Sequence, residues 1–387
     1  MTPSVTLPKA DGTCVGYRLH EPAVWQRPQQ TITSRIAFAA SHVVGDPFGE
    51  NVPGAPAKLD WDATLAFRRH LWSYGLGVAE AMDTAQRGMG LDWATARELI
   101  ARSAAEARSV GGRIAAGAGT DHATTALTDL SAVIRAYELQ VEEVEKSGAQ
   151  VILMASRQLA SIAGGPDDYA TVYGRVLSQI SQPAILHWLG PAFDPALAGY
   201  WGSADIEQST ASFVSLVTEH RGAIDGVKVS LLDMDHELAL RKSLPAEVRI
   251  YTGDDFNYVD LIRGDGAPGS DALLGIFSAI APAASVALQA LDRQDIAGYD
   301  AALNPTVGLS RHLFAAPTFF YKAGIAFLAW LSGHQAGFTM VAGLQSARSV
   351  VHLAEALRLA DQAGLLPDPD LAARRWSSFL AVAGIVG

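Results

Sequence analysis

The sequence contains a single cysteine, Cys14, among its 387 residues. One thiol excludes an intramolecular disulfide framework and any metal site built from several cysteines. Basic residues are also scarce, since Lys and Arg total 29 against 40 Asp and Glu, which gives a net charge of −11. This balance disfavours electrostatic attachment to nucleic acid or to an anionic membrane surface. We therefore expect neither nucleic acid nor a membrane as a partner.

The sequence also lacks a long apolar run and a secretory signal. Its most hydrophobic run, Phe319 to Gly333, contains Lys322 and is too short to span a bilayer, so it predicts a buried or interface helix. The first ten residues lack the basic-then-apolar pattern of a signal peptide, which favours a cytoplasmic protein. Residues 319–331 carry more large apolar side chains than one helix face needs, and we therefore expect a homo-oligomer.

Short apolar runs alternate with amphipathic segments from Arg35 to Leu291. The runs predict eight strands, at 35–41, 77–82, 113–118, 151–155, 184–189, 224–230, 249–252 and 272–276. The segments after them predict eight helices, at 60–74, 92–109, 130–147, 167–181, 204–220, 234–243, 258–263 and 282–291. Continuous apolar strands are typical of a parallel sheet buried on both faces. Eight strand–helix units in this length predict an α/β fold, the (β/α)8 TIM barrel.

The rest of the chain flanks this barrel. An open doubly wound sheet is the alternative, but no glycine-rich dinucleotide fingerprint follows the first strand and no P-loop is present. Residues 1–34 predict an N-terminal extension, residues 35–291 the barrel, and residues 292–387 a C-terminal helical region of three or four helices.

Lys228 lies in the apolar run 224–230, near the carboxyl end of the sixth predicted strand. Burial penalises an ammonium group. Such a lysine is either held by a salt bridge or has a lowered pKa, which leaves its amine able to attack a carbonyl and form a Schiff base. In barrels of this kind the reactive groups lie at the carboxyl ends of the strands.

Four stretches of the sequence are similar to the dihydrodipicolinate synthase / N-acetylneuraminate lyase family of class I aldolases. They are Gly226-Val227-Lys228, Thr252-Gly253-Asp254-Asp255, Gly275-Ile276-Phe277-Ser278 running to Ala281-Pro282, and Ala116-Gly117-Ala118-Gly119-Thr120. The resemblance covers about residues 35–365 and is that of a divergent branch. It implies that Lys228 is a Schiff-base lysine on the sixth strand of the barrel.

The sequence departs from this family at three turns. The family's Gly-Thr-Thr-Gly-Glu turn, which holds a 2-keto-acid carboxylate, is replaced here by Asp83-Thr84-Ala85-Gln86-Arg87. His187 stands where the family has a proton-relaying tyrosine, and Ser156-Arg157-Gln158 replaces Pro-Tyr-Tyr. The lysine therefore matches the family, whereas the pyruvate cradle does not.

Several further residues are candidates for the site. A neutral imidazole can shuttle protons near pH 7, so His187 is predicted to be catalytic, with a satisfied core histidine as the alternative. Arg87 and Arg157 either clamp an acidic substrate or bridge to Glu80 or Asp83. Either Asp254 or Asp255 orients substrate hydroxyls while the other caps a helix. The predicted substrate-binding residues are Asp83, Thr84, Arg87, Arg157, Trp188, Gly253 and Asp254; for Trp188, packing is the alternative.

We predict a Schiff-base-forming lyase or aldolase that forms or cleaves a C–C bond in a small keto acid or keto sugar, without a metal or other cofactor. The first alternative is a divalent-metal-dependent sugar isomerase or epimerase that uses Glu80, Asp83, His187 and Asp254, although no H-x-H or H-E-x-x-H spacing supports a metal site. The second is a non-catalytic binding barrel, which a blocked pocket at Lys228 would indicate.

Overall fold

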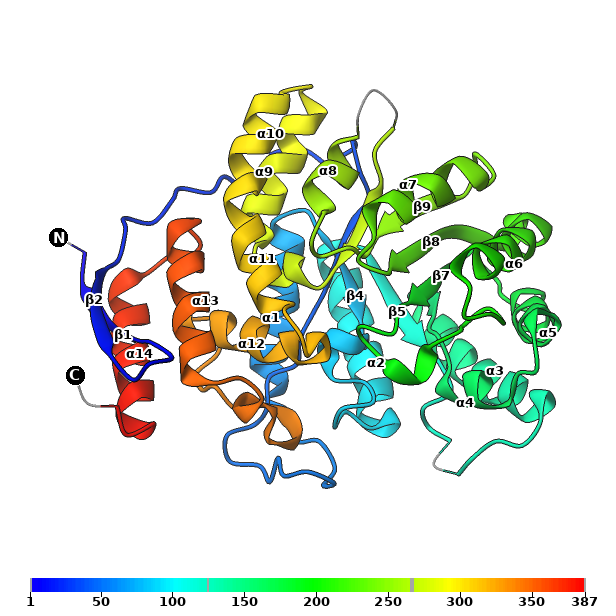
Figure 1. The fold of residues 1–387 in the computed structure, drawn as a ribbon, viewed down its shortest axis with the longest axis horizontal. Coiled ribbons are helices and arrows are strands. Elements are labelled where there is room, and N and C mark those ends of the chain that lie inside the picture. Colours follow the sequence, from blue (N-terminus) through cyan, green and yellow to red (C-terminus); the bar gives the residue numbers. More distant parts are fainter. Residues whose placement is uncertain (1, 124, 265–267, 386–387) are drawn as a thin grey trace.

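A closed barrel of eight parallel strands forms the centre of the molecule, which is described by a computed structural model for residues 2–123, 125–264 and 268–385 (Figure 1). Neighbouring strands pair in the order β10-β3-β4-β5-β6-β7-β8-β9, which confirms the predicted TIM barrel. The strands are β3 (Ala37–Ala40), β4 (Gly77–Glu80), β5 (Ile114–Ala118), β6 (Gln150–Leu153), β7 (Ala184–Leu189), β8 (Ile224–Ser230), β9 (Arg249–Thr252) and β10 (Asp271–Leu274).

The surrounding helices begin where an aspartate can cap them. The carboxylates of Asp60, Asp92, Asp129, Asp205 and Asp233 each accept a backbone N–H from the first turn of the next helix. The helices are α1 (Trp61–Ser73), α2 (Trp93–Val110), α3 (Leu130–Ser147), α4 (Arg157–Ile162), α5 (Pro166–Leu177), α6 (Ile206–Glu219), α7 (Met234–Ser243), α8 (Tyr258–Arg263) and α9 (Ala281–Asp292). The short helix α4 was not predicted.

Side chains alternate between the inside and the outside of the barrel wall, as they do along any strand. Phe38, Ile185 and Tyr251 belong to the cluster that fills the barrel interior. Trp188 and Val229 belong instead to the layer between the strands and the outer helices. On β7 and β8 this alternation turns His187 and Lys228 toward the interior.

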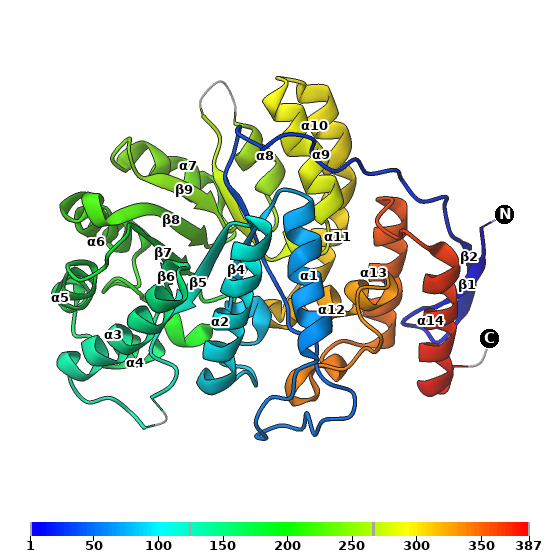
Figure 2. The same ribbon diagram turned by 180° about the vertical axis from the view of Figure 1, so that it is seen from behind.

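The C-terminal helices lie beside the barrel, next to α1 and α9 (Figures 1 and 2). The described residues contain five α-helices here, one more than the upper prediction: α10 (Ile296–Leu303), α11 (Val307–Leu313), α12 (Tyr321–Leu331), α13 (Val350–Gln362) and α14 (Pro369–Val382). All 11 residues of α12 are buried within the chain. This internal burial accounts for its apolar composition, so α12 no longer argues for a subunit contact, and the homo-oligomer stays a prediction.

Among the residues described, no single helix has both the length and the apolar character needed to cross a membrane. One bent pair, Ile296–Leu313 with Thr318–Leu331, meets that test on length and composition alone.

The N-terminal extension contains an antiparallel hairpin that was not predicted, formed by β1 (Ser4–Pro8) and β2 (Cys14–Arg18). The hairpin packs on α13 and α14, and both chain ends lie on this side of the molecule (Figure 2). The indole nitrogen of Trp376 donates a hydrogen bond of 2.7 Å to the carbonyl of Thr6. The N-terminal extension therefore packs on the C-terminal helices and does not form a domain of its own.

Candidate active site

Lys228 lies inside the barrel, two residues before the carboxyl end of β8. In the sheet it is level with His187 of β7 and Tyr251 of β9, and the residue is only 8% exposed. Gly253, just after β9, leaves room for the Lys228 side chain. A Cβ at this position would clash, because it would lie 2.9 Å from Cε of Lys228 and 2.2 Å from Oγ of Ser230. Gly253, predicted to bind substrate, therefore makes space for the lysine instead.

Burial lowers the pKa of Lys228 to about 8, against the opposing charges of Asp255 and Asp83. Burial likewise raises the pKa of Asp255 to about 8, although its Oδ1 accepts a hydrogen bond of 2.9 Å from the backbone N–H of Ile276. Both side chains line the same small cavity, so the protonation of one depends on the other. Near neutral pH a usable fraction of the Lys228 amine is uncharged.

His187 faces the same cavity and is neutral. Burial, followed by the charge of Lys228, lowers the pKa of His187 well below its usual value. Its Nε2 lies 3.2 Å from Oγ of Ser230. Its Nδ1 is buried and has no hydrogen-bond partner among the described residues. The ring can therefore exchange a proton or a hydrogen bond with a ligand in the cavity.

The C-terminal helix α12 also contributes to this cavity, a contribution that sequence reasoning missed. The phenol oxygen of Tyr321 lies 2.6 Å from the hydroxyl of Thr84, and both residues line the cavity. Next to it, the fully buried ammonium of Lys322 donates a hydrogen bond of 2.9 Å to Oδ1 of Asp83. The one sequence signal was the lysine within an apolar run, which indicates a buried partner of opposite charge.

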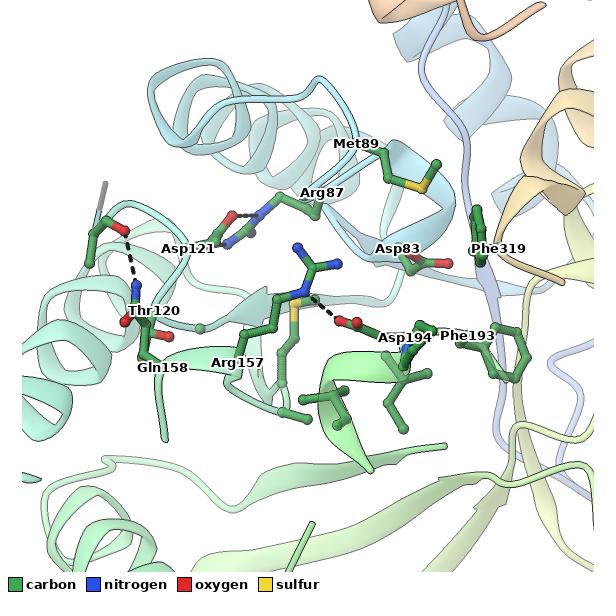
Figure 3. Close-up of a pocket in the computed structure, with 18 residues that line it drawn as sticks. Asp83, Arg87, Met89, Thr120, Asp121, Arg157, Gln158, Phe193, Asp194 and Phe319 are labelled. Atoms are coloured by element: carbon green, nitrogen blue, oxygen red, sulfur yellow. Dashed lines mark hydrogen bonds and ion pairs between the residues drawn. The ribbon is translucent and has the colours of Figure 1, made fainter. Parts of the chain in front are cut away.

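Two neighbouring cavities lie at the carboxyl ends of the strands. The inner cavity, beside Lys228, measures about 10 Å³, enough for about one water molecule. The outer cavity measures about 410 Å³ and is lined by the loops after β4, β5, β6 and β7, with Phe319 from the segment before α12 (Figure 3). Asp83, Leu189 and Phe193 line both. The inner cavity is too small for a carbonyl substrate, so side chains that line it must move before a ligand reaches Lys228. A narrow space at Lys228 is also what the non-catalytic alternative predicts.

Arg87 is not available as a clamp for an acidic substrate. Its guanidinium makes five hydrogen bonds within the protein, one for each N–H that the group possesses. Two go to the carboxylate of Asp121 and one to Gln140, and the side chain is 2% exposed. Arg87 therefore holds the loops after β4 and β5 together at the wall of the outer cavity.

Arg157, at the start of α4, is placed differently. Its Nε donates a hydrogen bond of 2.5 Å to Asp194, while its two terminal nitrogens have no hydrogen-bond partner among the described residues. Figure 3 shows its side chain extending across the outer cavity toward Asp194. Of the two predicted arginines, only Arg157 therefore has N–H groups, among the described residues, that can donate hydrogen bonds to a ligand.

Two other predicted binding residues do not line either cavity. Trp188 faces outward from β7 and packs against Trp201 and Phe213. Asp254 accepts hydrogen bonds from the backbone N–H groups of Phe256 and Asn257, in the turn before α8. The N-cap of α8 is Asn257, so Asp254 is not the helix cap that was expected of one of the two aspartates. Asp255 is the one that faces the cavity.

Of the residues assigned to the isomerase alternative, Asp83 and His187 line the inner cavity, whereas Glu80 and Asp254 do not. Both carboxylate oxygens of Glu80 bind the buried guanidinium of Arg68 at 2.9 Å, so its partner is an arginine that sequence reasoning did not identify. Over residues 2–123, 125–264 and 268–385, no group of three or more His, Cys, Asp or Glu is arranged to hold a metal ion.

Comparisons with known proteins give the family and the fold. A family model described as "Protein of unknown function (DUF993)" matches residues 5–385, so the chain belongs to that family. No curated protein matches the sequence.

Solved structures of the dihydrodipicolinate synthase family share the fold. YagE, a prophage protein of that family from E. coli K12 in complex with pyruvate, has a TM-score of 0.66 and 15% identity. Dihydrodipicolinate synthase from Thermotoga maritima has a TM-score of 0.64 and 14% identity, and that from Aquifex aeolicus has 0.63 and 13%. Each alignment covers 86% of this chain and 99% of the other. The chain therefore has a dihydrodipicolinate-synthase-like barrel.

Proposed function

We propose that this protein is a Schiff-base-forming lyase or aldolase that makes or breaks a C–C bond in a small carbonyl compound. The observation that carries the proposal is the buried Lys228, whose pKa is lowered to about 8 on the sixth strand of the barrel, at the inner of two neighbouring cavities. A lysine that is neutral near working pH is the form that attacks a carbonyl. The dihydrodipicolinate-synthase-like fold supports the same chemistry by analogy.

In the first half of the reaction, the neutral Lys228 amine adds to the carbonyl carbon and gives a carbinolamine. Loss of water from the carbinolamine leaves a cationic iminium. A base then removes the proton of the hydroxyl two carbons from the iminium carbon, a new C=O bond forms there as the C–C bond breaks, and this fragment leaves as a carbonyl compound. The electron pair of the broken bond converts the iminium into an enamine. Protonation of the enamine carbon gives an iminium again. Hydrolysis of this iminium by water then releases the ketone and restores the amine. The reverse sequence forms a C–C bond.

The neighbouring side chains suit these steps. Asp83 and Asp255 line the inner cavity, where carboxylates favour a positively charged iminium in a low-dielectric surrounding. His187 is neutral there, and the Tyr321–Thr84 hydroxyl pair faces the same space. These groups are positioned to move protons on and off the carbinolamine and the enamine carbon.

Reductive trapping tests the proposal. The protein is incubated with a panel of keto acids and keto sugars in the presence of cyanoborohydride, and its intact mass is measured. We expect one adduct per chain, equal to the substrate mass less one oxygen atom. Lys228→Arg keeps a positive charge but loses the amine nucleophile, so it should give no adduct.

Lys146→Met, on the surface of α3, serves as the matched control and should trap as the unaltered protein does. Full trapping by a folded Lys228→Arg protein would reject the lyase proposal.

A further inference from the structure

The charges around the inner cavity disfavour a carboxylate attached directly to the reacting carbonyl. Lys228 is the one cationic side chain among the described residues that line this cavity, and its nitrogen becomes part of the iminium. Asp83 and Asp255 line the same space. A 2-keto-acid carboxylate would lie beside the Asp83 carboxylate, and like charges repel strongly where water is excluded. Asp255, whose pKa burial raises to about 8, adds little repulsion near neutral pH.

Two buried polar atoms in this cavity have no hydrogen-bond partner within the described residues, namely Oδ2 of Asp83 and Nδ1 of His187. An unpaired buried polar atom is unfavourable, so both atoms are suited to a ligand that completes their hydrogen bonds. An ionised carboxylate on a ligand can only accept, and therefore cannot bond to Oδ2 of Asp83. A hydroxyl both donates and accepts, and can satisfy either atom.

The free donors for an anionic group lie farther out, on Arg157. Its two terminal nitrogens are unpaired among the described residues, whereas Asp121 and other partners occupy the whole guanidinium of Arg87. Gly88 lies beside these nitrogens, since a Cβ there would be 3.4 Å from Nη1, an ordinary contact, and its φ of +72° favours glycine. The outer cavity, at about 410 Å³, is large enough for a chain of several carbons between Arg157 and Lys228.

We propose that the substrate of Lys228 is a hydroxylated ketone or aldehyde whose anionic group, a phosphate or a carboxylate, lies at the far end of the molecule and binds the terminal nitrogens of Arg157. The hydroxyls next to the carbonyl bond to Asp83 and His187. This inference rests on the proposed Schiff-base function and narrows its substrate from any keto acid or keto sugar to polyhydroxylated carbonyl compounds with a distal anion.

Trapping with cyanoborohydride at graded ligand concentrations tests the inference with four probes. Pyruvate carries a carboxylate beside the carbonyl, and dihydroxyacetone carries hydroxyls without a charge. Ribulose 5-phosphate and 5-ketogluconate carry hydroxyls with a distal phosphate and a distal carboxylate. The two distal anions should reach half-maximal labelling at concentrations about tenfold lower than the other two probes, as a charge-assisted hydrogen bond predicts.

Arg157→Met should remove this tenfold advantage of the probes with a distal anion. The dihydroxyacetone concentration for half-maximal labelling should stay within about twofold of its value in the unaltered protein. Arg97→Met, an exposed arginine on α2 outside both cavity linings, is the matched control and should change neither. Comparison of the phosphate and carboxylate probes shows which anion the outer cavity prefers.

The possible outcomes distinguish a wrong substrate class from a wrong Schiff-base function. If pyruvate labels Lys228 at the lowest concentration, or if Arg157→Met leaves ribulose 5-phosphate labelling unchanged, the substrate class is wrong while the Schiff-base function stands. If none of the four probes labels Lys228, both the substrate class and the lyase proposal are rejected.

Discussion

The phenol oxygen of Tyr321 lies 2.6 Å from the hydroxyl oxygen of Thr84, which joins the C-terminal helix α12 to the loop after β4. The Tyr321 ring stacks on Phe314, with the ring centres 4.2 Å apart and the planes at 16°. A Cβ at Gly275 would lie 2.9 Å from that ring, so the end of β10 is shaped to receive it. A helix outside the barrel thus places a fixed hydroxyl in the cavity of Lys228.

Tyr321→Phe should slow turnover while leaving the protein folded. The substitution keeps the stacked ring and removes only the hydroxyl. A positioned proton-transfer group typically contributes about 10²-fold or more, so we expect kcat to fall by about that factor with little change in KM. Steady-state kinetics with the carbonyl compound that traps best provides the measurement.

Tyr299→Phe is the matched control, because its buried hydroxyl bonds to the carbonyl of Val259 at 2.7 Å, outside the cavity lining. Each change should cost about 1 kcal/mol of stability through one lost hydrogen bond. Equal kinetics for the two variants would show that Tyr321 is only structural.

The rate of trapping should rise with pH through about 8. Below that value most Lys228 is protonated and unreactive, so the rate increases about tenfold per pH unit before it levels off. Asp255→Asn should move the midpoint to lower pH, because the Asp255 charge opposes the lowering of the Lys228 pKa. Initial trapping rates between about pH 6 and 10 measure this. A midpoint near the ordinary lysine value, or a shift upward in Asp255→Asn, would contradict the assignment.

Lys228→Met should make the protein more stable at pH 7. A folded-state pKa of about 8, below the ordinary 10.5, means that the native state resists the charged form. The unfolded chain binds the extra proton between these two pH values, so the unfavourable contribution of Lys228 is complete below pH 8 and fades as pH rises toward 10.5. Replacing Lys228 with Met should therefore increase the free energy of unfolding at pH 7 by as much as about 3 kcal/mol.

Urea unfolding of Lys228→Met and the unaltered protein at pH 7 and at pH 10 checks this linkage. The difference in unfolding free energy should shrink at the higher pH. A variant that is destabilised at pH 7 would instead indicate a lysine whose charge supports the fold.

Lys322→Met should destabilise the protein by about 3 kcal/mol. The substitution leaves the mostly buried carboxylate of Asp83 without its cation, and it loosens the attachment of α12 to the loop after β4. The double variant Asp83→Leu, Lys322→Met removes both charges and should recover part of the loss. Thermal unfolding measures both proteins, and equal melting points for Lys322→Met and the unaltered protein would refute the role of this ion pair.

Local patterns were enough to predict the barrel and its lysine. The predicted bounds of β7, β8, β9, α3, α7 and α8 match the structure, and the other barrel elements differ by one to four residues. Apolar runs, glycines at helix C-termini and aspartate N-caps each involve only a few consecutive residues, so they can be recognised in a single sequence. The β1–β2 hairpin was missed because the apolar alternation of β1 is confined to five residues, and β2 is largely exposed.

The candidate site was only partly predictable, since much of it depends on contacts between distant segments. Lys228 and His187 lie on adjacent strands and could be placed together by counting strands. Tyr321 reaches the inner cavity, and Lys322 its partner Asp83, through the docking of α12, which no local pattern specifies. The same holds for Arg87, whose acceptors include Asp121 in the loop after β5 and Gln140 on α3, and for the Arg68–Glu80 pair.

The most direct test of the central claim is to locate the trapped adduct in the sequence. Two lysines are buried near the cavities, and only Lys228 lines the inner one, whereas Lys322 is held by Asp83. After cyanoborohydride trapping with the best carbonyl probe, proteolysis and tandem mass spectrometry should place a single adduct on Lys228. An adduct on Lys322, or labelling spread over exposed surface lysines with Lys228 unmodified, would contradict the assignment of Lys228 as the Schiff-base residue.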